Sequence, residues 1–438
     1  MEAVTKPLEL RVPLCAAEHE AAKRTVCVTG ASGYVAAFVV QRLLAAGHTV
    51  HAAVRSRAKA QFLTRLPGAG KHLRVFEGCD LLVPGSFDAA VAGCDCVMHT
   101  ASPFAIGVRA DKVQETLIKP AVEGTRNVLD SVNRTPSVGR VVLTSSITAV
   151  LSYPIPGRTY TEADWNDQAS GQGQLCCLAV HATDSEYAYE LSKTLAEKAA
   201  WEAAGAQGRW DLVALLPGLV FGPPMDFGHS TAQSVHVMRR MLRGDMSVGY
   251  PEYLLKAVDV RDVAKAHAMA MITPGAHGRY LLTPHDFSFG HVKRIIAAGP
   301  LGKDRGIVRR LPSEPLFKRL LWLIADLINI ERYRIYQMYG VELHTDGSRC
   351  ERDLGMTSWV PDAEMYNQMA ATMIVMGMCK WMEPLKYAPL CAADSLAPAA
   401  YDGPWRGSCW DSCCCIVADA SQRAILGSYE VHNEVKPR

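Results

Sequence analysis

A tyrosine and a lysine four residues apart, Tyr189 and Lys193, are the pair in this chain best suited to move a proton. Side chains at this spacing lie on one face of a helix, and residues 187–204 have the pattern of one. A tyrosine has an unperturbed pKa of about 10, so it works as an acid or base near neutrality only when its surroundings lower that value. The ammonium group of Lys193 is expected to do so.

Two adjacent serines, Ser145 and Ser146, directly follow residues 141–144, which have the composition of a buried strand. Such a strand would deliver a hydroxyl group to the carboxyl edge of a sheet, where it can orient and polarise a carbonyl oxygen. A tyrosine–lysine pair alone often arises by chance. The order of a glycine-rich loop, a serine strand and a tyrosine–lysine helix along the chain favours interconversion of a carbonyl and an alcohol.

The glycine-rich loop lies between residues 25–29, which predict a short buried strand, and residues 34–46, which predict a helix. This context is the one that a dinucleotide-binding fingerprint requires. The first glycine permits a tight turn, the second lets the backbone approach a pyrophosphate at the helix N-terminus, and Ala36 allows close helix–strand packing. The residues predicted to contact the cofactor here are Gly30, Ala31, Ser32, Gly33, Tyr34 and Val35.

Arg55 follows a second predicted strand, residues 49–54, at the place where an acidic residue would bind the ribose of NAD. An arginine there binds a 2′-phosphate through two hydrogen bonds instead. Ser56, Arg57 and Lys59 extend the polar patch. We therefore predict NADP as the cofactor and regard NAD as the less favoured alternative.

The elements that position these residues alternate regularly along the chain. Further strands are predicted at residues 73–77, 96–100, 140–145 and 211–216, and a further helix at residues 113–132. This alternation predicts an α/β fold, a Rossmann-type doubly wound parallel sheet, with a smaller C-terminal substrate-binding lobe. Residues 257–271 predict a strand that returns to the sheet and a helix that follows it.

Three parts are expected along the chain. Residues 1–23 form an N-terminal lead, residues 24–382 the enzyme, and residues 383–438 a cysteine-rich tail. Within the enzyme, the NADP-binding core is expected to comprise residues 24–220 and 257–272, and the substrate lobe the other segments after residue 220.

The composition limits the classes to which the protein could belong. With 438 residues, 49% of them hydrophobic, the chain can bury a large core, which excludes a mainly disordered protein. A net charge of +2 argues against binding to nucleic acid. The fourteen cysteines show neither zinc-ribbon spacing nor a disulfide framework, so no metal site is expected.

No apolar run reaches the length of about 18 residues that a transmembrane helix needs, and no signal peptide is recognised. We expect a cytoplasmic protein, monomeric or homodimeric. Two segments leave a peripheral membrane contact open. Residues 316–330 predict either a helix that covers the substrate pocket or a helix on a membrane surface. The tail carries Cys413, Cys414 and Cys415 and is expected to be either an unstructured appendage or a site of S-acylation.

Seven segments of the chain, together with a weaker one at residues 352–357, resemble extended short-chain dehydrogenases/reductases of the NAD-dependent epimerase/dehydratase family. The resemblance covers about residues 24–382 and is strongest to the branch of dihydroflavonol 4-reductases, cinnamoyl-CoA reductases and aldehyde reductases. The seven segments are residues 26–36, 54–55, 85–95, 119–129, 141–146, 189–201 and 216–223.

The resemblance implies a role for each site residue. Ser146 polarises the carbonyl, with Ser145 as the alternative, Tyr189 donates the proton, and Lys193 holds the ribose and tunes the tyrosine. Asp80 and Leu81 flank the adenine. The remaining cofactor contacts are Thr100, Ala101 and Ser102 along the cofactor and Pro217, Gly218, Leu219 and Val220 at the nicotinamide.

The chain departs from the cinnamoyl-CoA reductases just before the tyrosine. Their tryptophan and cysteine are missing from residues 184–188, so an acyl-CoA substrate is not expected, and the insert 171–183 with Cys176 and Cys177 would lie near the substrate entrance. We predict an NADP(H)-dependent oxidoreductase that acts on an aldehyde, a ketone or a flavanonol-like compound. The alternatives are a 3β-hydroxysteroid-type dehydrogenase, a sugar-nucleotide epimerase/dehydratase, which would need a further acid–base pair beside Ser146, and a non-catalytic NADP-sensing protein.

Two other polar residues are interpreted differently. His99 is expected to be a core histidine or one that lies beside the cofactor, rather than a base. Asn127 would either hold a structural water or pack between helices.

Overall fold

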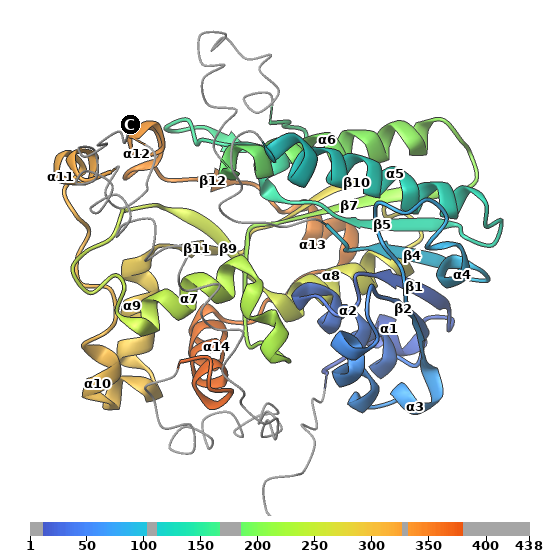
Figure 1. The fold of residues 1–438 in the computed structure, drawn as a ribbon, viewed down its shortest axis with the longest axis horizontal. Helices are drawn as coiled ribbons and strands as arrows, with labels where there is room; N and C mark the ends of the chain where they lie inside the picture. Colours follow the sequence, from blue (N-terminus) through green and yellow to red (C-terminus); the bar gives the residue numbers. More distant parts are fainter. Residues whose placement is uncertain (1–11, 103–111, 167–184, 326–331, 380–438) are drawn as a thin grey trace, which may run out of the picture.

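The computed structural model describes residues 12–102, 112–166, 185–325 and 332–379 (Figure 1). Within these residues, seven strands form one parallel sheet in the order β10-β7-β5-β4-β1-β2-β3. The strands are β1 (Thr25–Thr29), β2 (Thr49–Ala53), β3 (Leu73–Phe76), β4 (Cys96–His99), β5 (Arg140–Thr144), β7 (Asp211–Pro217) and β10 (Gly278–Leu282). The chain reverses its direction of growth between β1 and β4, where such sheets bind their ligands.

Helices cover both faces of this sheet. Alternate residues of a strand point to opposite sides, and in β1 the residues on both sides are apolar and buried. Val26 and Val28 of β1 belong to the core cluster that includes α2 (Tyr34–Ala45) and α8 (Val260–Ile272). Cys27 belongs to the other cluster, with side chains of α5 (Lys119–Asn133) and α6 (Ser185–Gly205). Figure 1 shows α5 and α6 on one side of the strands and α2 and α8 on the other. The predicted doubly wound sheet is confirmed.

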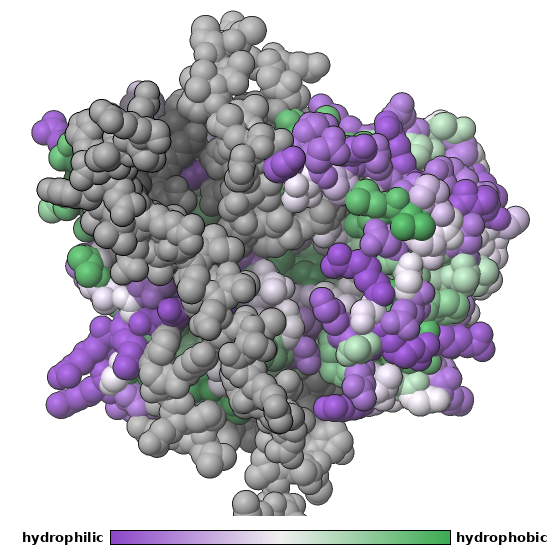
Figure 2. Space-filling model, viewed as in Figure 1, coloured by the Kyte–Doolittle hydropathy of each residue, from purple (hydrophilic) through white to green (hydrophobic). Residues whose placement is uncertain are grey.

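The smaller elements around the seven-stranded sheet, which we call the sheet half of the molecule, are α3 (Ala69–His72), α4 (Asp88–Val91), the 3₁₀-helices 58–65 and 147–149, and α13 (Arg349–Leu354). A π-helical turn, residues 114–118, precedes α5, where one continuous helix was expected. In the space-filling view, hydrophilic residues dominate the surface over the sheet half, with scattered apolar patches (Figure 2). This is expected of helices whose apolar faces are turned to a sheet.

The strand expected to return to the sheet does not do so. Residues Leu255–Asp259 form β9, which pairs with β8 (Leu219–Phe221) and β11 (His285–Phe287) in a separate three-stranded sheet. The seventh strand of the main sheet is β10, which was not predicted. Gly218 allows β9 to approach the chain just before β8, because a Cβ atom there would lie 2.6 Å from the main-chain oxygen of Lys256.

The small sheet belongs to a second group of elements, which lies beside the main sheet in Figure 1. Its helices are α7 (Gln233–Arg243), α9 (Phe289–Ala298), α10 (Arg305–Val308), α11 (Lys318–Leu323), α12 (Arg332–Met338) and α14 (Asp362–Val375). A two-stranded ladder joins β6 (Thr159–Tyr160) to β12 (His344–Thr345). The extent of a substrate lobe and the predicted domain boundaries stay predictions.

The segment before the first strand is packed against the core. Its helix α1 (Ala16–Glu20) carries Glu18, whose carboxylate is 1% exposed and pairs with Arg42 of α2. The Oε1–Nε and Oε2–Nη2 distances are both 2.6 Å. Burial alone would raise the pKa of Glu18, but the hydrogen bonds and charge of Arg42 lower it. The described part of the expected lead therefore anchors α2.

The segment 316–330 is helical only over Lys318–Leu323 in its described part, and residues 326–330 lie outside the described residues. Leu321 packs against Ile335 of α12, whereas Phe317 and Leu323 are exposed. The two interpretations of this segment, a helix over the substrate pocket and a helix on a membrane surface, both stay predictions. Within the described residues, no helix is long and apolar enough to cross a membrane. The tail 383–438 with its cysteine cluster lies outside the described residues.

Candidate active site

The turn after β1 has the shape that its glycines predict. Gly30 adopts a φ of 63°, and a Cβ atom there would lie 3.0 Å from the Cα atom of Ala101. Gly33 closes the turn by donating its N–H to the oxygen of Gly30 over 2.8 Å, and α2 begins at the next residue with no side-chain cap. The N–H groups at the start of α2 therefore have no side-chain acceptor, as a pyrophosphate site requires.

The side chain of Tyr34 does not face this turn freely. It is buried, and its hydroxyl donates a 2.7 Å hydrogen bond to the oxygen of Gly222 after β8. Of the two helix residues predicted to contact the cofactor, Tyr34 therefore offers its main chain, while its side chain anchors the segment that follows residues 217–220. Val35 is partly buried, and Ala31 is fully buried.

Arg55 and Asp80 follow neighbouring strands, β2 and β3. Arg55 is exposed, and no ion pair or hydrogen bond joins its side chain to another described residue. The loop after β3 is ordered by its own bonds, since Asp80 Oδ1 accepts from the N–H of Leu82 over 2.9 Å. Asn127 of α5 donates a 2.7 Å bond to the oxygen of Leu81, so its amide fastens this loop to the helix. An exposed guanidinium at the end of β2 is free to bind a 2′-phosphate.

The hydroxyl of Thr29 connects β1 and β4 at the point where the strand order reverses. It lies 2.9 Å from His99 Nδ1 and accepts the N–H groups of Thr100 and Ala101 over 3.2 and 3.1 Å. Burial, aided by the charge of Lys193, lowers the pKa of His99 to about 3. His99 is therefore a neutral core histidine, as predicted. Thr29 itself was not predicted as part of the site, although it ends the first strand.

Tyr189, Ser146 and Lys193 are brought together at the carboxyl edge of β5. The side chains of Tyr189 and Ser146 are hydrogen-bonded to each other. Ser146 also accepts the N–H of Thr148 over 3.2 Å, which fixes the turn that follows it. The ammonium group of Lys193 donates a 3.0 Å bond to the oxygen of Thr144, the last residue of β5.

The two ionisable groups of this trio are both perturbed. Burial raises the pKa of Tyr189 to about 12, while the bond to Ser146 lowers it and the charge of Glu190 raises it. Burial lowers the pKa of Lys193 to about 8, and the charge of Glu197 raises it. The expected lowering of the tyrosine pKa by Lys193 is not seen, because the ammonium group is turned to the oxygen of Thr144 and Ser146 is the group that lowers it. Tyr189 therefore holds its proton near neutrality, and the lowered pKa expected from the sequence is not found in the cofactor-free protein.

The two adjacent serines have different partners. Ser145 donates a 2.6 Å bond to Oε2 of Glu197 in the protein interior, whereas Ser146 contacts Tyr189. Of the two serines, Ser146 is thus the one placed for chemistry.

The predicted nicotinamide contacts follow β7, the strand beside β5. Pro217 ends β7, Gly218 donates its N–H to the oxygen of Leu282 over 3.1 Å, and Leu219 and Val220 open β8 as partly exposed residues. These residues and Ser146 therefore lie at the same edge of the sheet.

Several expectations concern residues that are not described. They include the insert 171–183 with Cys176 and Cys177, residue 184, and the side chains of residues 185–187. Within the described residues, no group of three or more His, Cys, Asp or Glu residues could hold a metal ion. The seven cysteines described are all free thiols.

The predicted cofactor residues therefore lie at or after the carboxyl ends of β1, β2, β3, β4 and β7, at the edge where parallel sheets of this kind bind their ligands. A family model described as "NAD dependent epimerase/dehydratase family" matches residues 26–282. The chain belongs to this family. The resemblance predicted from the motifs is confirmed, and it extends to particular reductases within the family.

Two curated relatives in this family are plant reductases. The chain is 38% identical over 277 residues to a cinnamoyl-CoA reductase of Medicago truncatula, which covers 62% of this chain and 79% of the relative. It is 33% identical over 277 residues to a dihydroflavonol 4-reductase of Hordeum vulgare, which covers 63% and 74%.

One solved structure with a similar fold is that of Gre2 from Candida albicans in complex with NADPH. It superposes with a TM-score of 0.63 and 26% identity over 80% of this chain and 98% of Gre2. The predicted fold class is thereby confirmed a second time.

Proposed function

We propose that this protein is an NADP(H)-dependent reductase that interconverts a carbonyl and an alcohol, with Ser146, Tyr189 and Lys193 as its catalytic residues. The observation that carries the proposal is the hydrogen bond between Ser146 and Tyr189 at the carboxyl edge of β5, with Lys193 bonded to the same strand end. The enzyme class, an NAD(P)-dependent oxidoreductase, and the cofactor, NADP, agree with the reductase relatives and with the NADPH complex of Gre2.

Each residue of the trio has a distinct task. Bound NADPH supplies the hydride. Ser146 donates a hydrogen bond to the carbonyl oxygen, which polarises the carbonyl group and increases the positive charge on its carbon. Tyr189 gives its proton to the same oxygen as negative charge develops there. Lys193, protonated below its pKa of about 8, holds the ribose hydroxyls with the N–H groups that Thr144 does not use.

The cofactor residues divide the dinucleotide among them. The turn at Gly30 and Gly33 and the start of α2 would hold the pyrophosphate, and Arg55 would bind the 2′-phosphate. Residues 80–81 would flank the adenine, residues 100–102 would line the middle of the cofactor, and residues 217–220 would contact the nicotinamide. Support for these places comes from the edge of the sheet that all these segments share.

The substrate in this proposal is a free aldehyde, a ketone or a flavanonol-like compound. A cinnamoyl-CoA reductase is a relative, but residues 185–188 of this chain read Ser-Glu-Tyr-Ala, without the tryptophan and cysteine of those enzymes. We therefore do not propose an acyl-CoA thioester. A cytoplasmic location and a monomeric or homodimeric state remain part of the proposal.

The test is consumption of NADPH and of NADH by the purified protein with a panel of aldehydes, ketones, flavanonols, 3-ketosteroids and cinnamoyl-CoA. We expect turnover of at least one free carbonyl compound, faster with NADPH. Turnover of cinnamoyl-CoA alone would contradict the substrate class. Turnover of steroids alone would favour the 3β-hydroxysteroid alternative, and NADPH binding without turnover of any compound would favour a sensor.

A further inference from the structure

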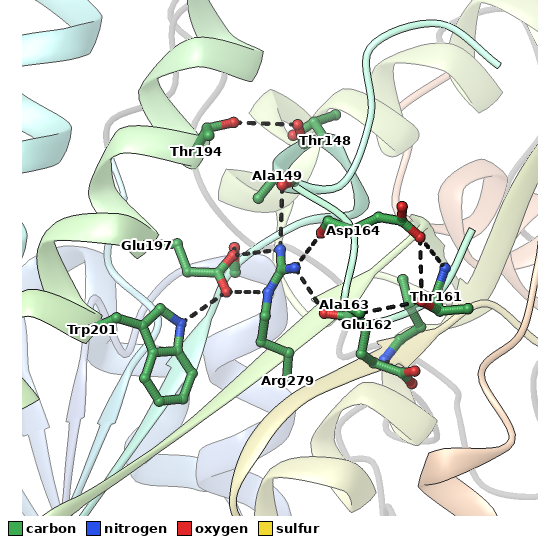
Figure 3. A network of polar contacts seen from close by, with 12 residues as sticks. Thr148, Ala149, Thr161, Glu162, Ala163, Asp164, Thr194, Glu197, Trp201 and Arg279 are labelled. Carbon is green, nitrogen blue, oxygen red and sulfur yellow. Dashed lines mark hydrogen bonds and ion pairs between the residues drawn. The ribbon is translucent and has the colours of Figure 1, made fainter. Parts of the chain in front are cut away.

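A buried ion pair lies directly behind the catalytic trio. Arg279 of β10 and Glu197 of α6 approach to 2.7 Å between Nε and Oε1, and their side chains are only 7% and 0% exposed. Moving two charges from water into the interior is costly, and the cost is offset only when the remaining donors and acceptors also find partners. Figure 3 shows this pair within a network of polar contacts.

The guanidinium of Arg279 is fully used. Besides Glu197, it donates through Nη1 to the oxygens of Glu162 (2.9 Å) and Asp164, and through Nη2 to the oxygen of Ala149 at 3.2 Å. Its carbon Cζ lies 3.9 Å from the ring centroid of Trp165, a cation–π contact. One arginine thus fastens the 162–165 segment and the turn after Ser146 to β10.

The carboxylate of Glu197 is equally occupied. Oε1 also accepts from Nε1 of Trp201 over 3.2 Å, and Oε2 accepts the hydroxyl of Ser145 over 2.6 Å and Nη2 of Arg279 over 3.4 Å. These four donors replace the water that the carboxylate loses on burial.

The pair reaches the active site through neighbours along the chain. Glu197 lies four residues after Lys193, one turn further along α6, and its charge acts on Lys193. Ser145, which it holds, precedes Ser146 in the chain, and Ala149, which Arg279 holds, ends the turn that Ser146 caps. The network therefore joins the segment that carries Ser146 to the helix that carries Tyr189.

We propose that Glu197, held in place by Arg279, is a positioning residue of the reductase site. Its carboxylate orients the 145–149 segment so that Ser146 meets Tyr189, and it balances the buried ammonium group of Lys193. The inference rests on the proposed function, because it assumes that Ser146 and Lys193 act on substrate and cofactor. It extends that function to a residue pair that touches neither.

The charges near Lys193 make the second part of this role measurable. Glu197 on the same helix acts on Lys193 through its charge, and the neutral His99 at the end of β4 feels the charge of Lys193. Burial lowers the pKa of Lys193, and among these groups Glu197 is the one that raises it. Removal of that charge should lower the pKa of Lys193 further, by about one unit or more for a close opposite charge.

The experiment compares Glu197→Gln with Glu18→Gln. Both substitutions remove the carboxylate of a buried arginine pair of similar length and exposure, but the Glu18–Arg42 pair lies on the opposite face of the sheet, away from the trio. The readouts are the pH dependence of kcat/KM for NADPH, thermal unfolding, and NMR titration of ¹³Cε-labelled lysine in the cofactor-free protein. The Lys193 signal is assigned from its loss in Lys193→Arg.

Both variants should unfold at lower temperature, but only Glu197→Gln should move the Lys193 titration and the alkaline limb of kcat/KM down by about one pH unit. At pH 8 its kcat/KM should fall about fivefold, because the protonated fraction of Lys193 falls from about one half to about one tenth. Unshifted titration and pH limb in Glu197→Gln would overturn the inference, and so would equal shifts in Glu18→Gln.

If Glu197→Gln does not fold, Glu197→Gln/Arg279→Met removes the unpaired guanidinium as well, and the same readouts apply to it. Failure of the proposed function would look different, since the wild-type protein would then turn over no carbonyl compound while the Lys193 titration still reported on Glu197.

Discussion

The hydroxyl of Ser145 donates a 2.6 Å hydrogen bond to Oε2 of Glu197 in the protein interior. A hydroxyl has one proton to give, so Ser145 cannot polarise a substrate oxygen without leaving a buried carboxylate short of a donor. Its neighbour Ser146 is the serine bonded to Tyr189. These contacts favour Ser146 over Ser145 as the serine that polarises the carbonyl, a choice that the sequence alone leaves open.

The serines can be separated by single substitutions. Ser146→Ala should lower kcat by about 10²–10³-fold, as expected for loss of a donor to a developing oxyanion, with little change in thermal stability. Ser145→Ala should lower the unfolding temperature and reduce kcat by less than about tenfold, because it acts through Glu197. Steady-state kinetics and thermal unfolding of both variants check this. If Ser145→Ala loses more kcat than Ser146→Ala, the catalytic hydroxyl belongs to Ser145 and the assignment to Ser146 is wrong.

Arg55 should decide between the two nicotinamide cofactors. Replacement by alanine removes a charge-assisted contact of about 1.5–3 kcal/mol with the 2′-phosphate. The dissociation constant of NADPH should therefore rise by about 10–100-fold, while that of NADH changes little.

The matched control for Arg55 is Arg65→Ala, which removes an exposed arginine from the end of the following 3₁₀-helix. Fluorescence titration of both cofactors measures the outcome. An unchanged ratio of NADPH to NADH affinity in Arg55→Ala would show that another group reads the 2′-phosphate.

The pH dependence should report Lys193. Burial holds the pKa of this ammonium group at about 8 in the cofactor-free protein, so the charged form is lost as the pH rises through that value. Because kcat/KM reports the free enzyme, kcat/KM for NADPH should fall above about pH 8. The proton of Tyr189, whose pKa is about 12, is retained throughout that range.

An arginine in place of Lys193 keeps its charge at every pH in this range. Lys193→Arg should therefore be slower but lack the alkaline limb. A wild-type profile that stays flat to pH 10, about two units above that pKa, would contradict the assignment of the limb to Lys193.

The sheet was largely readable from the sequence, because parallel strands covered on both faces read as short apolar runs between helices. β10 escaped prediction because its first two residues are Gly278 and Arg279. Arg279 is buried in a pair with Glu197, 82 residues away in the chain. A contact between residues so far apart leaves no local signal. The strand expected at the start of residues 257–271 exists as part of β9, but it pairs with β8 and β11 rather than with the main sheet.

The residues of the candidate site also divide into those that the sequence predicts and those that it does not. The trio and the glycine turn were predicted because their chemistry depends on residue type and order along the chain. Glu197 was overlooked although it lies four residues after Lys193, since a glutamate on a helix usually faces solvent. Thr29 was read only as the end of a strand, and its bonds to His99, Thr100 and Ala101 depend on the pairing of β1 with β4.

The most direct test of the proposed mechanism is the rate of carbonyl reduction by Tyr189→Phe under saturating NADPH, measured beside its affinity for NADPH. The substitution removes one hydroxyl group, the proposed proton donor, and leaves the ring in place. We expect kcat to fall by about 10²–10⁴-fold while the dissociation constant of NADPH changes less than about threefold, because Arg55 and the glycine turn are intact. A variant that reduces the same substrates at the wild-type rate would contradict the account.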